Sequence, residues 1–244
     1  MLNTNFLKSD WHDRLLLFTT NPWLMIADLA ELLSFIVGLI FWKKFKETSI
    51  KWFILFLGYN FFNEIAALFY YVCGLGDNNS IFYNIRQFIY FTVHLFVFYD
   101  FLQKTRFRRS VLVFYGIWLI GYIYLLTTTN FLDKYALFSL ILGNFFLLIA
   151  VLFVLVEIIN SLSLSEIGSN ILIFIGLGLL LYLVISIPTS VTTFFGWARI
   201  GNDTGPRMEF YKILRNVGTI SGALMYLIFA YGFYRSKRPD ILEL

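Results

Sequence analysis

The sequence contains one cysteine, Cys73, and only two histidines, His12 and His94, among 244 residues. A single cysteine cannot form a disulfide within the chain. The two histidines lie far apart and match no zinc-protease motif, and no cysteine–histidine cluster accompanies them. No serine occupies a nucleophile elbow. We therefore expect no metal site, and we disfavour an enzyme without excluding one.

Charged residues are also scarce, at 14% of the chain, whereas about 25% is usual for a soluble domain. Hydrophobic residues make up 59% and aromatic residues 20%. This composition predicts an integral membrane protein whose main partner is the lipid bilayer, and the net charge of +4 suggests no nucleic-acid partner. Residues 1–21 lack the pattern of a cleaved signal peptide, and we expect a short interfacial helix or a floppy tail there.

Seven apolar stretches are each long enough to cross about 30 Å of hydrocarbon as a helix. They are residues 22–42, 50–73, 80–101, 110–128, 135–158, 170–193 and 209–234. The predicted fold is an all-α bundle of seven transmembrane helices that forms a single domain over residues 1–244. Two glycines in the sixth span, Gly176 and Gly178, should allow close helix contact.

The distribution of lysine and arginine predicts the orientation. The loops 43–51 and 102–109 and the C-terminal tail together contain eleven of these residues, and the opposite side contains five. The N-terminus should therefore lie outside and the C-terminus in the cytoplasm, most simply in a bacterial inner membrane. Loop 159–169 is the one exception to this pattern. It should be cytoplasmic, but it contains no lysine or arginine, and its one charged residue is Glu166. The two basic loops suit anionic lipid or an acidic protein partner, although charges that merely set the topology are the simpler explanation.

The third span carries a polar stripe that must face protein or water rather than lipid. At about 100° per residue, its polar side chains fall within an arc of about 160° on a helical wheel. They are Asn84, Arg86, Gln87, Tyr90 and His94. This span should therefore lie inside the bundle and meet charged residues from other helices.

When the residues at the span ends are left aside, the spans contain three acids and three bases, which match in number: Asp28, Glu31, Glu64, Arg86, Lys212 and Arg215. Each would cost about 2.5–3.5 kcal/mol near the centre of a lipid-facing helix, so together they must pair or line water. We predict Glu64, Arg86 and Arg215 near the centre, with Asp28 or Glu31 reaching Lys212 or Arg215. Helices 1, 2, 3 and 7 should surround this polar core, which should open outward. The full candidate site is Asp28, Glu31, Asn60, Asn63, Glu64, Asn84, Arg86, Gln87, His94, Lys212, Arg215 and Asn216.

Two interpretations of this cluster remain open. It is either a cavity for a small polar or zwitterionic ligand, or a buried ion-pair network that fixes helix register. His94, deeper on the same stripe, either titrates near neutral pH and couples pH to conformation, or is a neutral core histidine. Asp100 and Glu157 are interpreted as interfacial residues that pair with bases of the loops.

Seven helices with an external N-terminus resemble the rhodopsins and G-protein-coupled receptors in layout alone. Where a retinal protein carries its lysine, in the middle of the last span, this chain has Gly222 and Ala223. We therefore expect no retinal and no other cofactor. The predicted function is a ligand sensor or signal relay, or an integral subunit of a membrane complex. A transporter of a small ion or polar metabolite, and an intramembrane lipid-modifying enzyme, are the alternatives.

Overall fold

The computed structural model of the chain describes residues 22–76, 78–132, 134–161, 163–196 and 206–237. These residues are almost entirely helical, and they form no strand. Seven helices are long and apolar enough to cross a membrane. They are α2 (Pro22–Ile40), α4 (Ile50–Val72), α5 (Ser80–Phe101), α6 (Thr105–Thr128), α7 (Leu137–Ser161), α9 (Ile171–Phe194) and α10 (Pro206–Arg235). The prediction of a seven-helix integral membrane protein is confirmed at this level.

The helix ends differ from the predicted spans mainly where polar residues continue a helix beyond its apolar part. Helix α6 begins at Thr105, five residues before the predicted position, because its first turns contain Arg106, Arg108 and Arg109. Two short helices, α3 (Trp42–Phe45) and α8 (Leu164–Ile167), were not predicted. The interfacial helix predicted within residues 1–21 lies outside the described residues.

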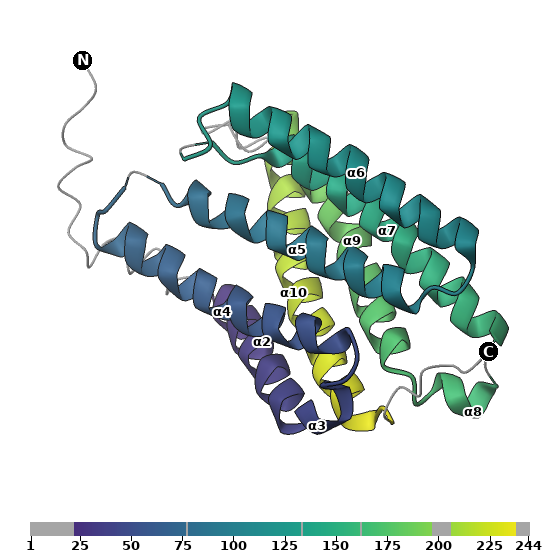
Figure 1. Cartoon of the computed structure of the whole chain (residues 1–244). Helices are drawn as coiled ribbons and strands as arrows, with labels where there is room; N and C mark the ends of the chain where they lie inside the picture. The colour runs from purple at the N-terminus through teal and green to yellow at the C-terminus, as the bar shows by residue number, and fades with distance from the viewer. Residues whose placement is uncertain (1–21, 77, 133, 162, 197–205, 238–244) are drawn as a thin grey trace, which may run out of the picture.

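Six of the spanning helices form a ring, and the seventh lies outside it (Figure 1). Each helix of the series α2, α4, α5, α7, α9 and α10 packs against the next, and α10 closes the ring by packing against α2. Helix α6 packs against α5 and α7 from outside. The first and last described spans are therefore neighbours although they are far apart in sequence.

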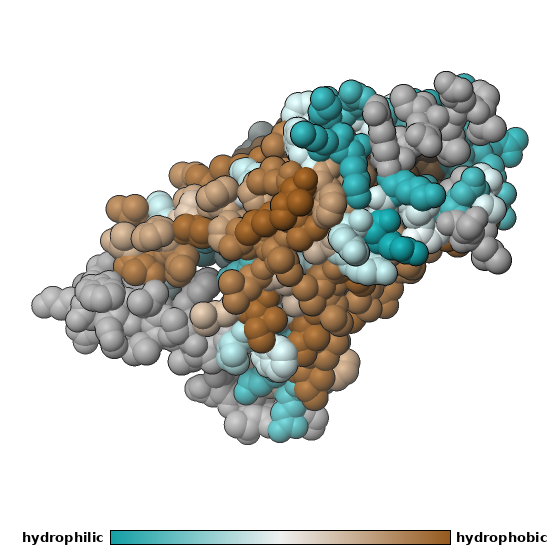
Figure 2. All heavy atoms as spheres, turned by 90° about the horizontal axis from the view of Figure 1, so that it is seen from below, coloured by the Kyte–Doolittle hydropathy of each residue, from teal (hydrophilic) through white to brown (hydrophobic). Residues whose placement is uncertain are grey.

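Aromatic side chains fill the interior of the ring. Phe53 of α4 and Phe229 of α10 meet edge to face with ring centroids 5.1 Å apart. Phe91 of α5 lies 5.0 Å from Trp118 of α6, and all four side chains are almost completely buried. Large apolar side chains are exposed on every spanning helix and form broad apolar areas on the surface (Figure 2). That distribution suits a bundle whose outer surface contacts lipid.

Glycines let neighbouring helices approach closely, as predicted for the sixth span. A Cβ atom on Gly178 would lie 2.7 Å from the Phe229 ring and 3.2 Å from the Met225 carbonyl oxygen. On α10, a Cβ atom on Gly232 would lie 2.5 Å from the Cβ atom of Phe174. Helices α9 and α10 are therefore packed too closely for a larger residue at either glycine.

The end of α10 is held by Lys44 of α3. The Lys44 ammonium group donates to the carbonyl oxygens of Tyr234 (3.3 Å) and Ser236 (3.1 Å), and it lies 4.1 Å from the centre of the Phe41 ring. A cation at a helix C-terminus satisfies carbonyl groups that have no partner within the helix. This contact joins the C-terminal end of α10 to α3, which directly follows the first span.

A capping box explains the unpredicted helix α8. The Ser163 hydroxyl group donates to the Glu166 carboxylate at 2.6 Å, and the Ser163 backbone N–H donates to the same oxygen at 2.9 Å. These donors hold the pKa of Glu166 below its usual range because they stabilise the ionised carboxylate. Ser163 and Glu166 are the serine and glutamate of the capping-box pattern, so this short helix had a local sequence signal.

Candidate functional site

A cavity of about 320 Å³ lies inside the ring, between the N-terminal halves of α2 and α5 and the middle parts of α4 and α10. Six spanning helices line it, and α6 does not. The expectation that only the first, second, third and seventh spans surround the polar core was therefore too narrow. Asn144 of α7 and Ser186 of α9 complete the opposite wall.

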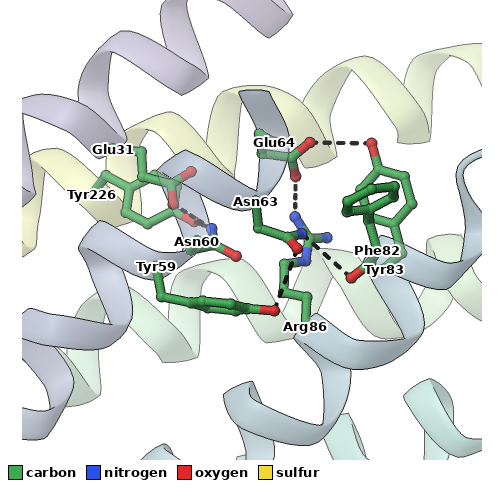
Figure 3. Close-up of polar contacts among 9 residues, drawn as sticks. All are labelled: Glu31, Tyr59, Asn60, Asn63, Glu64, Phe82, Tyr83, Arg86 and Tyr226. Carbon is green, nitrogen blue, oxygen red and sulfur yellow. Dashed lines mark hydrogen bonds and ion pairs between the residues drawn. The ribbon is translucent and has the colours of Figure 1, made fainter. Parts of the chain in front are cut away.

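The centre of the polar cluster is an ion pair between α4 and α5. Arg86 donates to the Glu64 carboxylate, and the Tyr83 hydroxyl group donates to the other carboxylate oxygen at 3.1 Å (Figure 3). The Arg86 guanidinium group also lies 4.8 Å from the centre of the Tyr83 ring. The Arg86 and Glu64 side chains are 28% and 21% exposed, so the pair faces the cavity without leaving the bundle.

A second polar group joins α2, α4 and α10. The Asn60 amide donates to the Glu31 carboxylate and, at 3.0 Å, to the Tyr226 hydroxyl oxygen (Figure 3). Glu31 and Asn60 are both almost completely buried. A carboxylate in this position requires a hydrogen-bond partner because its burial without one is costly.

The predicted link from Asp28 or Glu31 to Lys212 or Arg215 is not formed in the structure. Glu31 contacts the Asn60 amide instead, and among the described residues Asp28 and Arg215 form no ion pair although both line the cavity. Lys212 is exposed and does not line the cavity. The cluster therefore forms fewer ion pairs than predicted, because Glu31 accepts a hydrogen bond from Asn60 of the adjacent helix α4.

Three predicted asparagines, Asn63, Asn84 and Asn216, do not line the cavity. Asn216 is exposed on α10 and does not line the cavity. Asn63 is buried at the contact between α4 and α5, where it accepts from the Tyr59 hydroxyl group at 3.3 Å and donates to the Phe82 carbonyl oxygen at 3.3 Å. Asn63 therefore holds two helices together, and its side chain does not line the cavity.

Asn84 organises the loop between α6 and α7 and does not line the cavity. Its amide nitrogen donates to the carbonyl oxygens of Phe131 (2.8 Å) and Lys134 (2.9 Å), and its oxygen accepts from the Ala136 N–H at 2.9 Å. The Tyr122 hydroxyl group donates to the Asn84 carbonyl oxygen at 2.9 Å. The Asn84 side chain thus provides hydrogen-bond partners for three backbone groups of the loop between α6 and α7.

We expect Asn84→Ala to lower the free energy of unfolding by about 2 kcal/mol, because it leaves buried backbone groups without partners. Thermal and denaturant unfolding of the purified protein would measure the loss. Asn160→Ala is a suitable control, since the exposed Asn160 amide donates to the Val156 carbonyl oxygen of its own helix, and it should change stability by less than about 0.5 kcal/mol. Equal effects of the two substitutions would contradict this role of Asn84.

His94 lies one turn below the cavity in an aromatic environment. Its ring meets Phe53 and Phe56 edge to face at 5.3 and 5.1 Å, and its Nδ1 atom lies 2.7 Å from the Tyr90 carbonyl oxygen. The side chain is almost completely buried. These surroundings support the interpretation of His94 as a packed core residue.

Three lining groups have buried polar atoms with no hydrogen-bond partner among the residues that the structure describes. They are the Gln87 Oε1 atom, the Tyr90 hydroxyl group and the Asn144 Oδ1 atom. Gln87 and Tyr90 stood on the predicted stripe, but Asn144 was not included in the candidate site. Its signal was visible in the sequence as a lone amide within the apolar fifth span.

Glu157 also differs from its prediction. It is buried on α7, and its carboxylate accepts from the backbone N–H groups of Gln103 (2.9 Å) and Lys104 (2.8 Å). The expected partners were basic side chains of the loops. Glu157 instead fixes the start of α6, where backbone N–H groups have no partner within the helix.

Comparison with protein-family models, with curated proteins and with solved structures finds no match to this chain. A function therefore has to be argued from the cavity and from the residues that line it.

Proposed function

We propose that this membrane protein is a sensor that binds a small polar ligand in the cavity and relays the binding to a partner. The observation that carries the proposal is a cavity of about 320 Å³ with two charged lining residues, Asp28 and Arg215, that form no ion pair within the described part of the chain. Pockets for small molecules usually have volumes of about 300–1,000 Å³ and a few convergent polar groups. A network that served only to dock helices would pair its own charges.

The cavity supports binding better than passage through the membrane. Below it, Phe53, Phe91 and Phe229 are buried, and their rings contact one another or the rings of His94 and Trp118. A transporter needs a path to both faces, and this aromatic layer separates the cavity from the other end of the bundle.

Helix α10 supports a relay. Its middle part lines the cavity with Arg215, Thr219 and Tyr226, and its far end is held by Lys44 of the basic loop 43–51. A ligand that binds more tightly to one position of α10 would increase the population of that position. The end of α10 that is held by Lys44 would then move together with the part that lines the cavity. In the orientation predicted from the basic loops, the cavity faces outward and the far end faces a cytoplasmic partner.

The test is native mass spectrometry of protein purified gently from its own membranes, without removal of bound molecules. We expect a small-molecule adduct on the wild type, its loss from the double variant Asp28→Asn/Arg215→Gln, and its retention by the control Lys212→Gln. Co-purification of a protein in a fixed ratio would support the relay to a partner.

The other functions predict different results. Uptake of a substrate into proteoliposomes would favour a transporter, and a lipid product that disappears with Glu64→Gln would favour an enzyme. An adduct that survives in the double variant, or a bare wild-type monomer, would contradict the proposed binding site.

A further inference from the structure

Unsatisfied acceptor oxygens line the wall of the cavity formed by α5 and α7. Gln87 is 3% exposed and Asn144 is 1% exposed, yet the Gln87 Oε1 and Asn144 Oδ1 atoms have no donor within the described structure. The Gln87 amide is oriented by its nitrogen, which donates to the Ala136 carbonyl oxygen at 3.4 Å. A buried acceptor without a donor is costly, so this wall is built to receive donor groups.

The opposite wall adds acidic groups. Asp28 and Glu31 are three residues apart on α2 and both line the cavity. Only one oxygen of Glu31 accepts from Asn60, and Arg86 already pairs with Glu64. Asp28 therefore faces the cavity with no ion-pair partner among the described residues. An ammonium group, with three donors and a positive charge, matches such a carboxylate.

Arg215 supplies the complementary charge on the neighbouring helix α10. Helices α2 and α10 pack against each other, and Arg215 lines the cavity with no acidic partner among the described residues. A guanidinium group binds a carboxylate through two parallel hydrogen bonds. One ligand that carries both an ammonium and a carboxylate group would pair Asp28 and Arg215 at once.

We infer that the ligand is a small zwitterion of the amino-acid type whose side chain carries hydrogen-bond donors. Its ammonium group pairs with Asp28, its carboxylate pairs with Arg215, and its side-chain donors reach the Gln87 and Asn144 oxygens across the cavity. This inference rests on the proposed ligand-binding function and specifies the class of ligand.

The experiment measures the unfolding temperature of the full chain in nanodiscs with each standard free L-amino acid in turn. We expect a saturable rise with an amino acid that has an amide, hydroxyl or amine side chain, such as free L-glutamine. Free L-leucine and free L-methionine, of similar size but without side-chain donors, should bind at least about tenfold more weakly. The N-acetyl derivative and the carboxamide derivative of the best ligand, which lack the ammonium or the carboxylate group, should also bind at least about tenfold more weakly.

Variants assign the contacts. Asp28→Asn should weaken the best ligand but change the affinity of its N-acetyl derivative little, and Arg215→Gln should do the same for the carboxamide derivative. Gln87→Met, which keeps the size of the side chain, should reduce the preference for glutamine over leucine. If a variant unfolds, the contact that it tests is assigned from the ligand derivatives on the wild-type protein, and Lys212→Gln, outside the cavity, serves as the control for the remaining variants.

The outcomes separate this inference from the proposed function. If no amino acid stabilises the protein while native mass spectrometry still shows an adduct that depends on Asp28 and Arg215, the zwitterion class is wrong and the binding function stands. If the adduct is absent as well, both fail. Equal affinity for glutamine and leucine would overturn the role of the two amide oxygens.

Discussion

Replacing Arg86 with alanine should destabilise the protein more than any other single substitution considered for the cavity. The change leaves the Glu64 carboxylate inside the bundle with only the Tyr83 hydroxyl group as a donor among the described residues. Breaking a buried pair by removing one partner usually costs about 3–5 kcal/mol. We expect the lower end of that range, because about a quarter of each side chain remains exposed to the cavity.

Denaturant unfolding in mixed micelles would measure this loss, and two variants control it. Lys212→Ala removes an exposed base that does not line the cavity, so it should change stability by less than about 0.5 kcal/mol. The double variant Glu64→Gln/Arg86→Gln removes both charges and should be closer to the wild type than Arg86→Ala. Wild-type stability of Arg86→Ala would show that the pair does not hold α4 to α5.

The Gly232→Ala substitution should cost about 3 kcal/mol, although it adds a single methyl group. The new Cβ atom would lie 2.5 Å from the Cβ atom of Phe174 and 3.2 Å from the Ile171 side chain. A Cβ atom moves only with its backbone, so the clash can be relieved only if α9 and α10 separate. Overpacking of this kind usually costs about 1–3 kcal/mol, and we expect the upper end.

Gly116→Ala provides the matched control for this prediction. Gly116 is also within a spanning helix, α6, but a Cβ atom there would meet nothing within 4 Å. Its substitution should not lower the unfolding temperature, because alanine is the better helix former. Equal losses at the two positions would show that intrinsic helix stability, and not the contact between α9 and α10, determines the effect.

The spans were predictable because a bilayer requires long apolar helices, and this signal is local. The ends of α2, α4, α5 and α9 agree with the predicted spans within two residues. The start of α6 was missed because its first turns contain arginines. Arginine is compatible with a helix, but its transfer into lipid is unfavourable, so hydropathy excludes these residues from the predicted span. Hydropathy therefore locates the membrane-embedded part of a helix better than its end.

The cavity was predictable only in part. Helical periodicity gives the face on which a residue lies, and the balance of acids and bases placed Glu64 near Arg86, with which it pairs in the structure. It does not give the rotation of one helix against another, so it could not show that Asn84 faces a loop some 50 residues away or that Lys212 faces outward. The acceptor contributed by α7, the Asn144 side chain, was missed for the same reason. Asn144 lines the cavity because of how α7 is rotated against α5 and α9.

The closed ring has a consequence for biosynthesis. The surface of α2 that contacts α10 is synthesised early, but α10 follows about 165 residues later in the chain. At a synthesis rate of about 5–20 residues per second, the interval is on the order of 10–30 s. During this time Glu31 can already bind Asn60 of α4, while the Tyr226 contact and the Lys44 clamp must wait for the last span. The final step of assembly therefore closes the cavity wall and fixes the C-terminal end of α10 to α3.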